Sequence, residues 1–200
     1  IRNLLCLTGD HQTFGNHPHS KNVHDLDSIS LLQVCRDMRD KKIFECGDAI
    51  KGQEPRFLLG AAANPFADPF DYRPYRLAKK VNAGADFIQT QLIFNVPKFK
   101  EYMRRAVDLG VHEKTAILAG VGPIKSLGAA KYMATKVPGM DVDPGYVNRM
   151  RDCTKDLPSI SEIKAMDDPA EAKAARKARK DASEAEGIKI CVEIINACKE

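Results

Sequence analysis

Asn3-Leu4-Leu5-Cys6-Leu7-Thr8-Gly9-Asp10 is an apolar run near the start of the chain that stops at a Gly-Asp pair. Because polar residues do not alternate along it, the run predicts a strand buried on both faces of a parallel sheet. Asp10 then lies at the strand's carboxyl end, where parallel α/β folds place their chemistry. The residue type alone favours a helix or turn cap for Asp10, and its position makes a catalytic carboxylate an equal alternative. Since almost nothing precedes the run, we expect the chain to begin within a domain.

Composition excludes several classes of protein. The 200 residues are 44% hydrophobic and 29% charged, which suits a globular domain with a core of ordinary size. The sequence has no bilayer-length apolar stretch and no signal segment, so it predicts a cytoplasmic protein without a membrane partner. The net charge of +4 is too balanced to predict a nucleic-acid partner, and the basic segment 173–180 is read as a solvated helix face. Scattered cysteines predict reduced, buried thiols rather than metal ligands or disulfides; they are Cys6, Cys35, Cys46, Cys153, Cys191 and Cys198.

Further apolar runs alternate with helical patterns. They predict buried strands at residues 57–63, 87–94 and 115–121. Apolar positions at helical spacing predict helices at residues 75–82, 98–109 and 126–135. The order β-α-β-α-β-α-β-α predicts a parallel sheet with right-handed crossovers. Short strands followed by polar, glycine or proline residues favour a barrel over an open doubly wound sheet.

The barrel in this chain is expected to be incomplete. A (β/α)8 TIM barrel takes about 250 residues, so residues 1–200 are expected to form one truncated barrel domain with about strands 4–7. An open barrel exposes its strand edges and apolar interior, and missing sequence or a partner chain must close it. Residues 40–56 predict an added hairpin with a turn at Gly47-Asp48. Residues 138–170 predict an irregular excursion before a last helix from about Pro169 to Lys199.

Several groups could carry chemistry besides Asp10. The histidines at 11, 17 and 19 lie in a loop without the fixed spacing of a metal site, so no metal is predicted. Small residues at 60–63 either leave room for a flat ligand or pack tightly against a helix. Gln89 and Gln91 share one face of a strand, and are either satisfied core amides or, for Gln91, a partner for a heterocyclic ring edge. The glycine loop at 120–123 is a weak signal for phosphate binding at a helix terminus.

Together, four segments resemble the methylenetetrahydrofolate reductase family, in the form found in anaerobic bacteria. They are Leu7-Thr8-Gly9-Asp10, Ala62-Ala63-Asn64-Pro65, the stretch from Lys79 to Phe94, and the loop from Gly120 to Pro123. The resemblance covers residues 1 to about 150. It implies a (β/α)8 barrel that binds FAD without a Rossmann fingerprint. It also implies reduction of 5,10-methylenetetrahydrofolate to 5-methyltetrahydrofolate in one-carbon metabolism, as in methionine biosynthesis or acetogenesis.

The resemblance also assigns roles to individual residues. Asp10 would stabilise the cationic folate iminium and tune the flavin, Gln91 would hydrogen-bond the pterin, and Met133 would pack on the folate. The implied FAD contacts are Thr8, Gly9, Asp10, His24, Asp25, Ala62, Asn64 and Lys80. Arg73 occupies the place of an acidic FAD contact, with Asp71 close by. The general-acid glutamate of the family does not occur in this chain.

Two other functions remain open at this point. One is a different flavin-dependent barrel oxidoreductase acting on a C1 carrier or imine. The other is a non-catalytic barrel subunit of a larger complex. The electron donor is expected to be NAD(P)H or a partner redox protein, and the chain is expected to form an oligomer or to be part of a complex.

Overall fold

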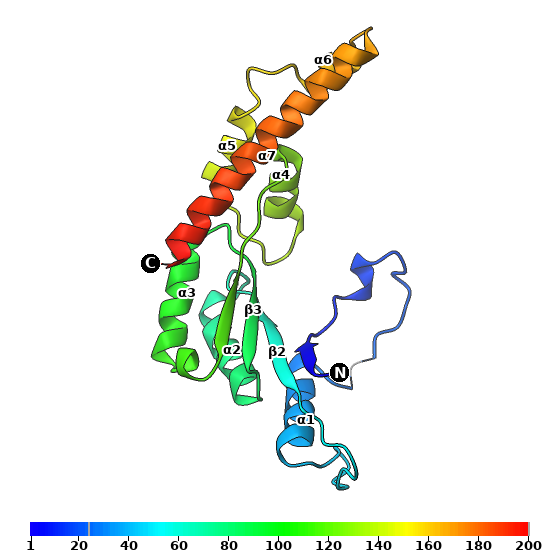
Figure 1. Ribbon diagram of the computed structural model, residues 1–200, viewed down its shortest axis with the longest axis vertical. Helices are drawn as coiled ribbons and strands as arrows, with labels where there is room; N and C mark the ends of the chain where they lie inside the picture. Colours follow the sequence, from blue (N-terminus) through cyan, green and yellow to red (C-terminus); the bar gives the residue numbers. More distant parts are fainter. Residues whose placement is uncertain (24, 200) are drawn as a thin grey trace. The chain divides into compact units, whose positions relative to one another are not determined.

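The computed structural model describes residues 1–23 and 25–199 (Figure 1). It divides into two compact units by internal contacts. The first comprises residues 1–64, 69–90 and 102–118, and the second comprises residues 65–68, 91–101 and 119–200. No helix in the described part of the chain is both long and apolar enough to cross a bilayer.

The strands form one four-stranded sheet in the order β1-β2-β3-β4, in which β1 pairs with β2, and β2 with β3, in parallel. The strands are β1 (Asn3–Cys6), β2 (Leu58–Ala63), β3 (Phe87–Leu92) and β4 (Ala116–Gly120). A helix follows each strand: α1 (Ser28–Asp40), α2 (Arg73–Asn82), α3 (Val96–Asp108) and α4 (Leu127–Lys136). Short 3-10 turns lie at Gln12–Phe14, Phe70–Tyr72 and Val111–Glu113. The predicted alternation and the predicted α/β class are therefore confirmed.

In the first unit, one face of the sheet is covered by helices. Cys6 of β1, Leu59 of β2 and Ile88 of β3 are buried on this face, and Leu32 of α1 and Leu77 of α2 are buried with them. Helix α1 begins where the Asp27 carboxylate accepts hydrogen bonds from the Ile29 and Ser30 amides, at 3.0 and 2.8 Å. The covered face is the hydrophobic core of this unit.

The opposite face of the same strands is open. The register pairs Asn3 with Leu58 and Leu5 with Gly60, which places alternate residues of both strands on this face. Leu5, Leu58 and Leu118 remain 41%, 49% and 53% exposed, and Leu7 is exposed just after β1. The prediction of strands buried on both faces is therefore wrong, because only one face has a covering layer of helices. Apolar side chains of the sheet are therefore exposed on this face.

The second unit packs α4 with three helices near the chain's carboxyl end: α5 (Pro144–Asp152), α6 (Ile160–Lys164) and α7 (Pro169–Lys199) (Figure 1). Ile190 and Ile194 are buried along α7. Gly187 lies against the Ile124 backbone. Arg149 of α5 donates from Nε to Glu186 of α7 at 2.7 Å. Helix α7 confirms the last helix that the sequence predicts from about Pro169 to Lys199.

The prediction of an irregular segment at 138–170 is wrong, since α5 and α6 lie within it. Both helices begin with recognisable caps. The Asp143 carboxylate accepts from the Gly145 amide at 2.7 Å, and Pro144 occupies the first helical position. Ser159 and Glu162 form a reciprocal capping box at the start of α6. At α5, therefore, the aspartate, proline and glycine residues that indicated a loop start a helix.

The hairpin predicted at residues 40–56 is present as a short antiparallel bridge between Ile43 and Ala49. The Phe44 amide donates to the Asp48 carbonyl at 2.8 Å, which closes the turn. Gly47 has a φ of 92°, a left-handed conformation that glycine adopts without steric cost.

Candidate functional site

The exit of β1 is joined to the start of α1 by a side chain. Thr8 Oγ1 accepts a hydrogen bond from the Ser28 amide at 2.9 Å, and Ser28 is buried. The neighbouring Asp27 carboxylate accepts from the first-turn amides, and the Ser30 amide is the main cause that lowers its pKa. Thr8, a predicted flavin contact, thus holds the loop end against the helix start.

Lys80 of α2 reaches back to the exit of β2. Its Nζ donates a hydrogen bond to the Ala62 carbonyl at 2.5 Å. Burial is the largest cause that lowers the pKa of Lys80, and the nearby positive charges of Arg76 and Arg73 lower it further. The structure therefore brings together two of the predicted FAD contacts, Ala62 and Lys80.

Arg73, Arg76 and Lys80 lie at helical spacing on one side of α2, and we call them the cationic edge. Asp27 approaches this group, with 4.0 Å between its Oδ2 and Arg76 Nη2. Asp71, which stands near the missing acidic contact in the sequence, instead forms an ion pair with Arg105. The cationic edge attracts anions, because the positive side chains of Arg73 and Arg76 lie around the half-buried Lys80 ammonium group.

Sequence reasoning identified Lys80 through the family resemblance and did not include Arg76. The signal that could have identified Arg76 is its position four residues before Lys80, on the same helical side.

Three other predicted contacts lie in the segment between β1 and α1. Gly9, Asp10 and Asp25 are exposed. Within the described part of the chain, Asp10 makes no hydrogen bond or ion pair, so the capping alternative for Asp10 does not hold there. His11 caps the following turn instead, its Nδ1 accepting from the Thr13 amide at 3.4 Å. The predicted contact at His24 lies outside the described residues.

The exit of β2 carries Asn64, which is half-buried. The space predicted for a flat ligand at Gly60 is filled, because the Phe87 ring of the neighbouring strand lies directly over this glycine. A methyl group at position 60 would overlap that ring. Gly60 is therefore tightly packed, but against a side chain of the neighbouring strand β3 and not against a helix as the alternative expected.

The two predicted folate contacts, Gln91 and Met133, belong to the second unit. Gln91 Oε1 accepts a hydrogen bond from the Leu92 amide at 2.9 Å, and the residue is half-buried. Met133 is half-buried on α4. Gln89 is exposed, so it is not the satisfied core amide that a strand buried on both faces would require.

Comparison with known proteins adds independent information on this arrangement. The family model described as methylenetetrahydrofolate reductase matches residues 1–167. Methylenetetrahydrofolate reductase 2 of Schizosaccharomyces pombe (strain 972 / ATCC 24843) is 28% identical over 177 residues, which cover 82% of this chain and 25% of that protein. The probable methylenetetrahydrofolate reductase (NADPH) of Caenorhabditis elegans is 26% identical over 138 residues, covering 67% of this chain and 18% of that protein.

The chain spans a quarter or less of the length of these two relatives. The family match nevertheless includes all four strands and every residue that the sequence predicted for the site. The chain therefore belongs to the methylenetetrahydrofolate reductase family.

Proposed function

We propose that this chain forms part of a flavin-dependent (β/α)8 barrel that reduces 5,10-methylenetetrahydrofolate to 5-methyltetrahydrofolate. The observation that carries the proposal is the cationic edge beside Ala62, within the family-matched part of the chain. The open apolar face of the sheet supports a barrel whose remaining strands come from further sequence or from another chain. The resemblance to the anaerobic bacterial form supports that type within the family.

The residues of the cationic edge fit the anionic part of FAD. Arg73 and Arg76 surround the half-buried Lys80 ammonium, and a diphosphate group would offset this concentration of positive charge. Lys80, the Ala62 backbone and Asn64 would hold the cofactor from β2 and α2. Thr8 and Gly9 would approach it from the exit of β1, together with Asp25. When bound, FAD supplies the hydride that the substrate carbon receives.

Asp10 would act on the substrate through its charge. It is exposed and makes no ion pair with the described residues, so its carboxylate is available to a cationic ligand. Opening of the methylene bridge of the folate generates an iminium cation, and a carboxylate beside that cation lowers the barrier to hydride transfer. A glutamate outside residues 1–200 would donate the proton to the ring nitrogen of the folate.

Gln91 and Met133 would bind the folate. An amide offers both a donor and an acceptor to the edge of the pterin ring, and a methionine side chain packs against flat rings. The electron donor would be NAD(P)H or a partner redox protein, and we place the protein in the cytoplasm as an oligomer or a complex subunit.

Replacement of Asp10 tests its catalytic role. Asp10→Asn should leave FAD bound and slow folate reduction by about 10²–10³-fold, the usual effect of losing one electrostatic stabiliser. Asp48→Asn, an exposed carboxylate in the hairpin, serves as the matched control and should not slow turnover. Equal turnover in the wild-type protein and in Asp10→Asn would remove Asp10 from the mechanism.

Replacement of Gln91 separates folate binding from structure. Gln91→Ala should weaken folate affinity by about tenfold, because the polar edge of the bound pterin ring would lose its hydrogen-bond partner. Gln89→Ala alters the same face of the same strand two residues earlier, and should leave folate affinity within about twofold. Equal losses in the two variants would show that Gln91 has no specific role.

A further inference from the structure

The second unit contains a cavity of about 590 Å³ that the proposed folate and flavin contacts do not use. Its walls come from the start of α4, from α6 and from α7. The volume lies in the range typical of small-molecule sites. The lining residues are Lys125, Ser126, Leu127, Gly128, Lys131, Thr154, Ile160, Ile163, Lys164, Arg176, Arg179, Lys180 and Ser183.

The charge of this cavity is of one sign. Lysines and arginines from α4, α6 and α7 line it, and no aspartate or glutamate does. Lys180 has a partial partner in Glu184, 3.5 Å away on the same helix. Among the described residues, the other lining lysines and Arg176 have no carboxylate within ion-pair distance. Several like charges around one cavity repel one another, and a bound anion would relieve that repulsion.

Arg179 fixes the wall between α6 and α7. Its guanidinium donates to the carbonyls of Thr154, Leu157 and Pro158 at 3.1, 3.1 and 2.9 Å, and to Thr154 Oγ1 at 3.0 Å. These hydrogen-bond partners are all neutral, and the Arg179 charge is offset only in part, by the Glu162 carboxylate, whose pKa the arginine helps to lower after the larger effect of Ser159. The wall is thus rigid and positive before any ligand binds.

Apolar and dipolar groups complete the cavity. Leu127, Ile160 and Ile163 contribute aliphatic surface, and Ile163 is buried. Helix α4 begins here: Ser126 Oγ accepts from the Ala129 amide at 3.1 Å. The amides of Leu127 and Gly128 precede the first helical carbonyl that could pair with them, so this end of α4 adds partial positive charge. The cavity therefore combines an apolar surface with a cationic one.

We propose that this cavity binds a small organic phosphate, with an apolar ring or chain on the isoleucine and leucine surface and the phosphate among the lysines. The volume limits the ligand to a small molecule, and compact ammonium groups with a helix start suit a phosphate. The α7 wall lies beyond residue 167, where the family match ends. None of the lining residues is among the proposed folate and flavin contacts.

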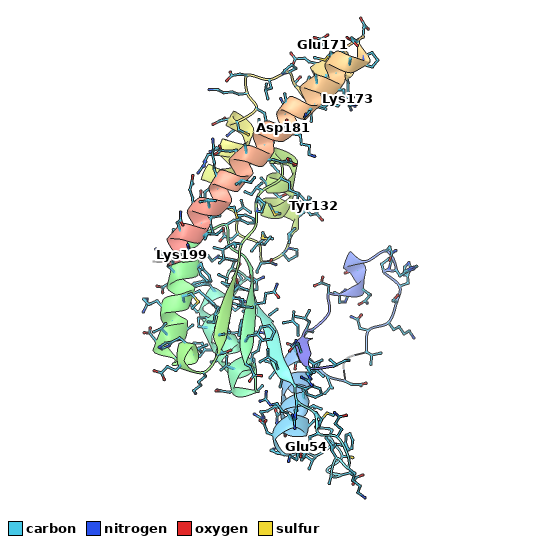
Figure 2. The ribbon with its side chains drawn as sticks, viewed as in Figure 1. Glu54, Tyr132, Glu171, Lys173, Asp181 and Lys199 are labelled. Atoms are coloured by element: carbon cyan, nitrogen blue, oxygen red, sulfur yellow. The ribbon has the colours of Figure 1, made fainter. Side chains whose placement is uncertain are left out.

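Calorimetric titration of the protein with phenyl phosphate tests this site. We expect binding that weakens as salt is added, and at least a tenfold weaker affinity in Lys131→Gln/Lys164→Gln, because two charged hydrogen-bond donors are lost. The matched control is Lys173→Gln/Lys177→Gln, which removes the same charge from α7 outside the cavity and should change the affinity less than twofold. Lys173 is labelled on α7 in Figure 2.

Further ligands test whether the phosphate group is required, and chemical shifts test whether binding occurs in this cavity. Benzyl alcohol and benzoate should both bind more weakly than phenyl phosphate, and amide chemical shifts should change at Leu127, Gly128 and Ser183 of the wild-type protein. The proposal is overturned if phenyl phosphate does not bind, if the two double variants lose equal affinity, or if the shifts change elsewhere. It is also overturned if a glutamate-rich peptide binds more tightly, since the cavity would then receive an acidic protein segment.

Discussion

Gly187→Ala should destabilise the second unit, although alanine is the better helix former. A Cβ atom built on Gly187 lies 2.9 Å from the Ile124 carbonyl carbon and 3.2 Å from its nitrogen, and is nearer still to its oxygen. Helix α7 would have to withdraw by about 1 Å before the contact with that oxygen reached 3.0 Å. All three neighbours are backbone atoms of a fully buried residue, so no side chain can rotate away.

Two opposing effects set the magnitude. Glycine to alanine in a helix interior stabilises by about 1 kcal/mol. Overpacking of a closely packed contact costs about 1–3 kcal/mol, and occasionally more. Because the clash involves rigid backbone, we expect an overpacking cost of about 3 kcal/mol or more. After the helix-propensity gain is subtracted, the free energy of unfolding should fall by about 2 kcal/mol or more.

Urea denaturation followed by far-UV circular dichroism measures this loss. Gly128→Ala is the matched control, because the nearest atom to its Cβ would be Ser126 Oγ at 3.8 Å, an ordinary contact. That control should be neutral or more stable by up to about 1 kcal/mol. If Gly187→Ala is as stable as the wild-type protein or more stable, the close approach of α7 to Ile124 is refuted.

Two further predictions concern titration and reactivity in the first unit. Burial lowers the pKa of Lys80 below its ordinary 10.5. Between the lowered pKa and pH 10.5, the unfolded chain therefore binds more protons than the folded protein, and the free energy of unfolding rises with pH. Lys80→Met should remove this rise in urea denaturation measured across that interval, whereas the exposed Lys79→Met should keep it; a rise that persists in Lys80→Met contradicts the assignment. Burial beside Cys35 raises the pKa of Cys6 to about 11, while Cys46 is exposed. Iodoacetamide at pH 8 should therefore alkylate Cys46 first, as read by peptide mass spectrometry, and early modification of Cys6 in folded protein would contradict its burial.

Much of the architecture could be predicted from the sequence, because it depends on local periodicity. The apolar runs correspond to β2, β3 and β4, and helical spacing located α2, α3, α4 and α7 within a few residues. The reduced cysteines were also expected, although only Cys6 and Cys35 are buried. Helices α5 and α6 do not follow from composition, because proline, aspartate and glycine also favour loops; the signals that indicate these helices are the caps at Asp143 and Ser159.

The sequence could not predict which strand residues are exposed or closely packed, because this depends on the elements that lie against each face of the sheet. Leu5 and Leu58 belong to apolar runs, yet their exposure follows from the absence of a covering layer on one face of the sheet in the described chain. Likewise, the Phe87 ring over Gly60 is a contact between residues far apart in sequence. In the site, the resemblance identified Lys80, whereas the Lys80 to Ala62 hydrogen bond and the part played by Arg76 required the structure.

The central claim is that this chain contributes to a flavin site that exchanges hydride with a folate. The most direct measurement is the visible flavin absorbance of the purified protein, loaded with FAD and mixed with 5-methyltetrahydrofolate without oxygen. We predict that the folate bleaches the flavin band, and that the bleaching slows in Asp10→Asn but not in Asp48→Asn. Flavin that is bleached by dithionite but not by the folate would favour a different C1 carrier or imine. A protein that binds no flavin would contradict the claim altogether.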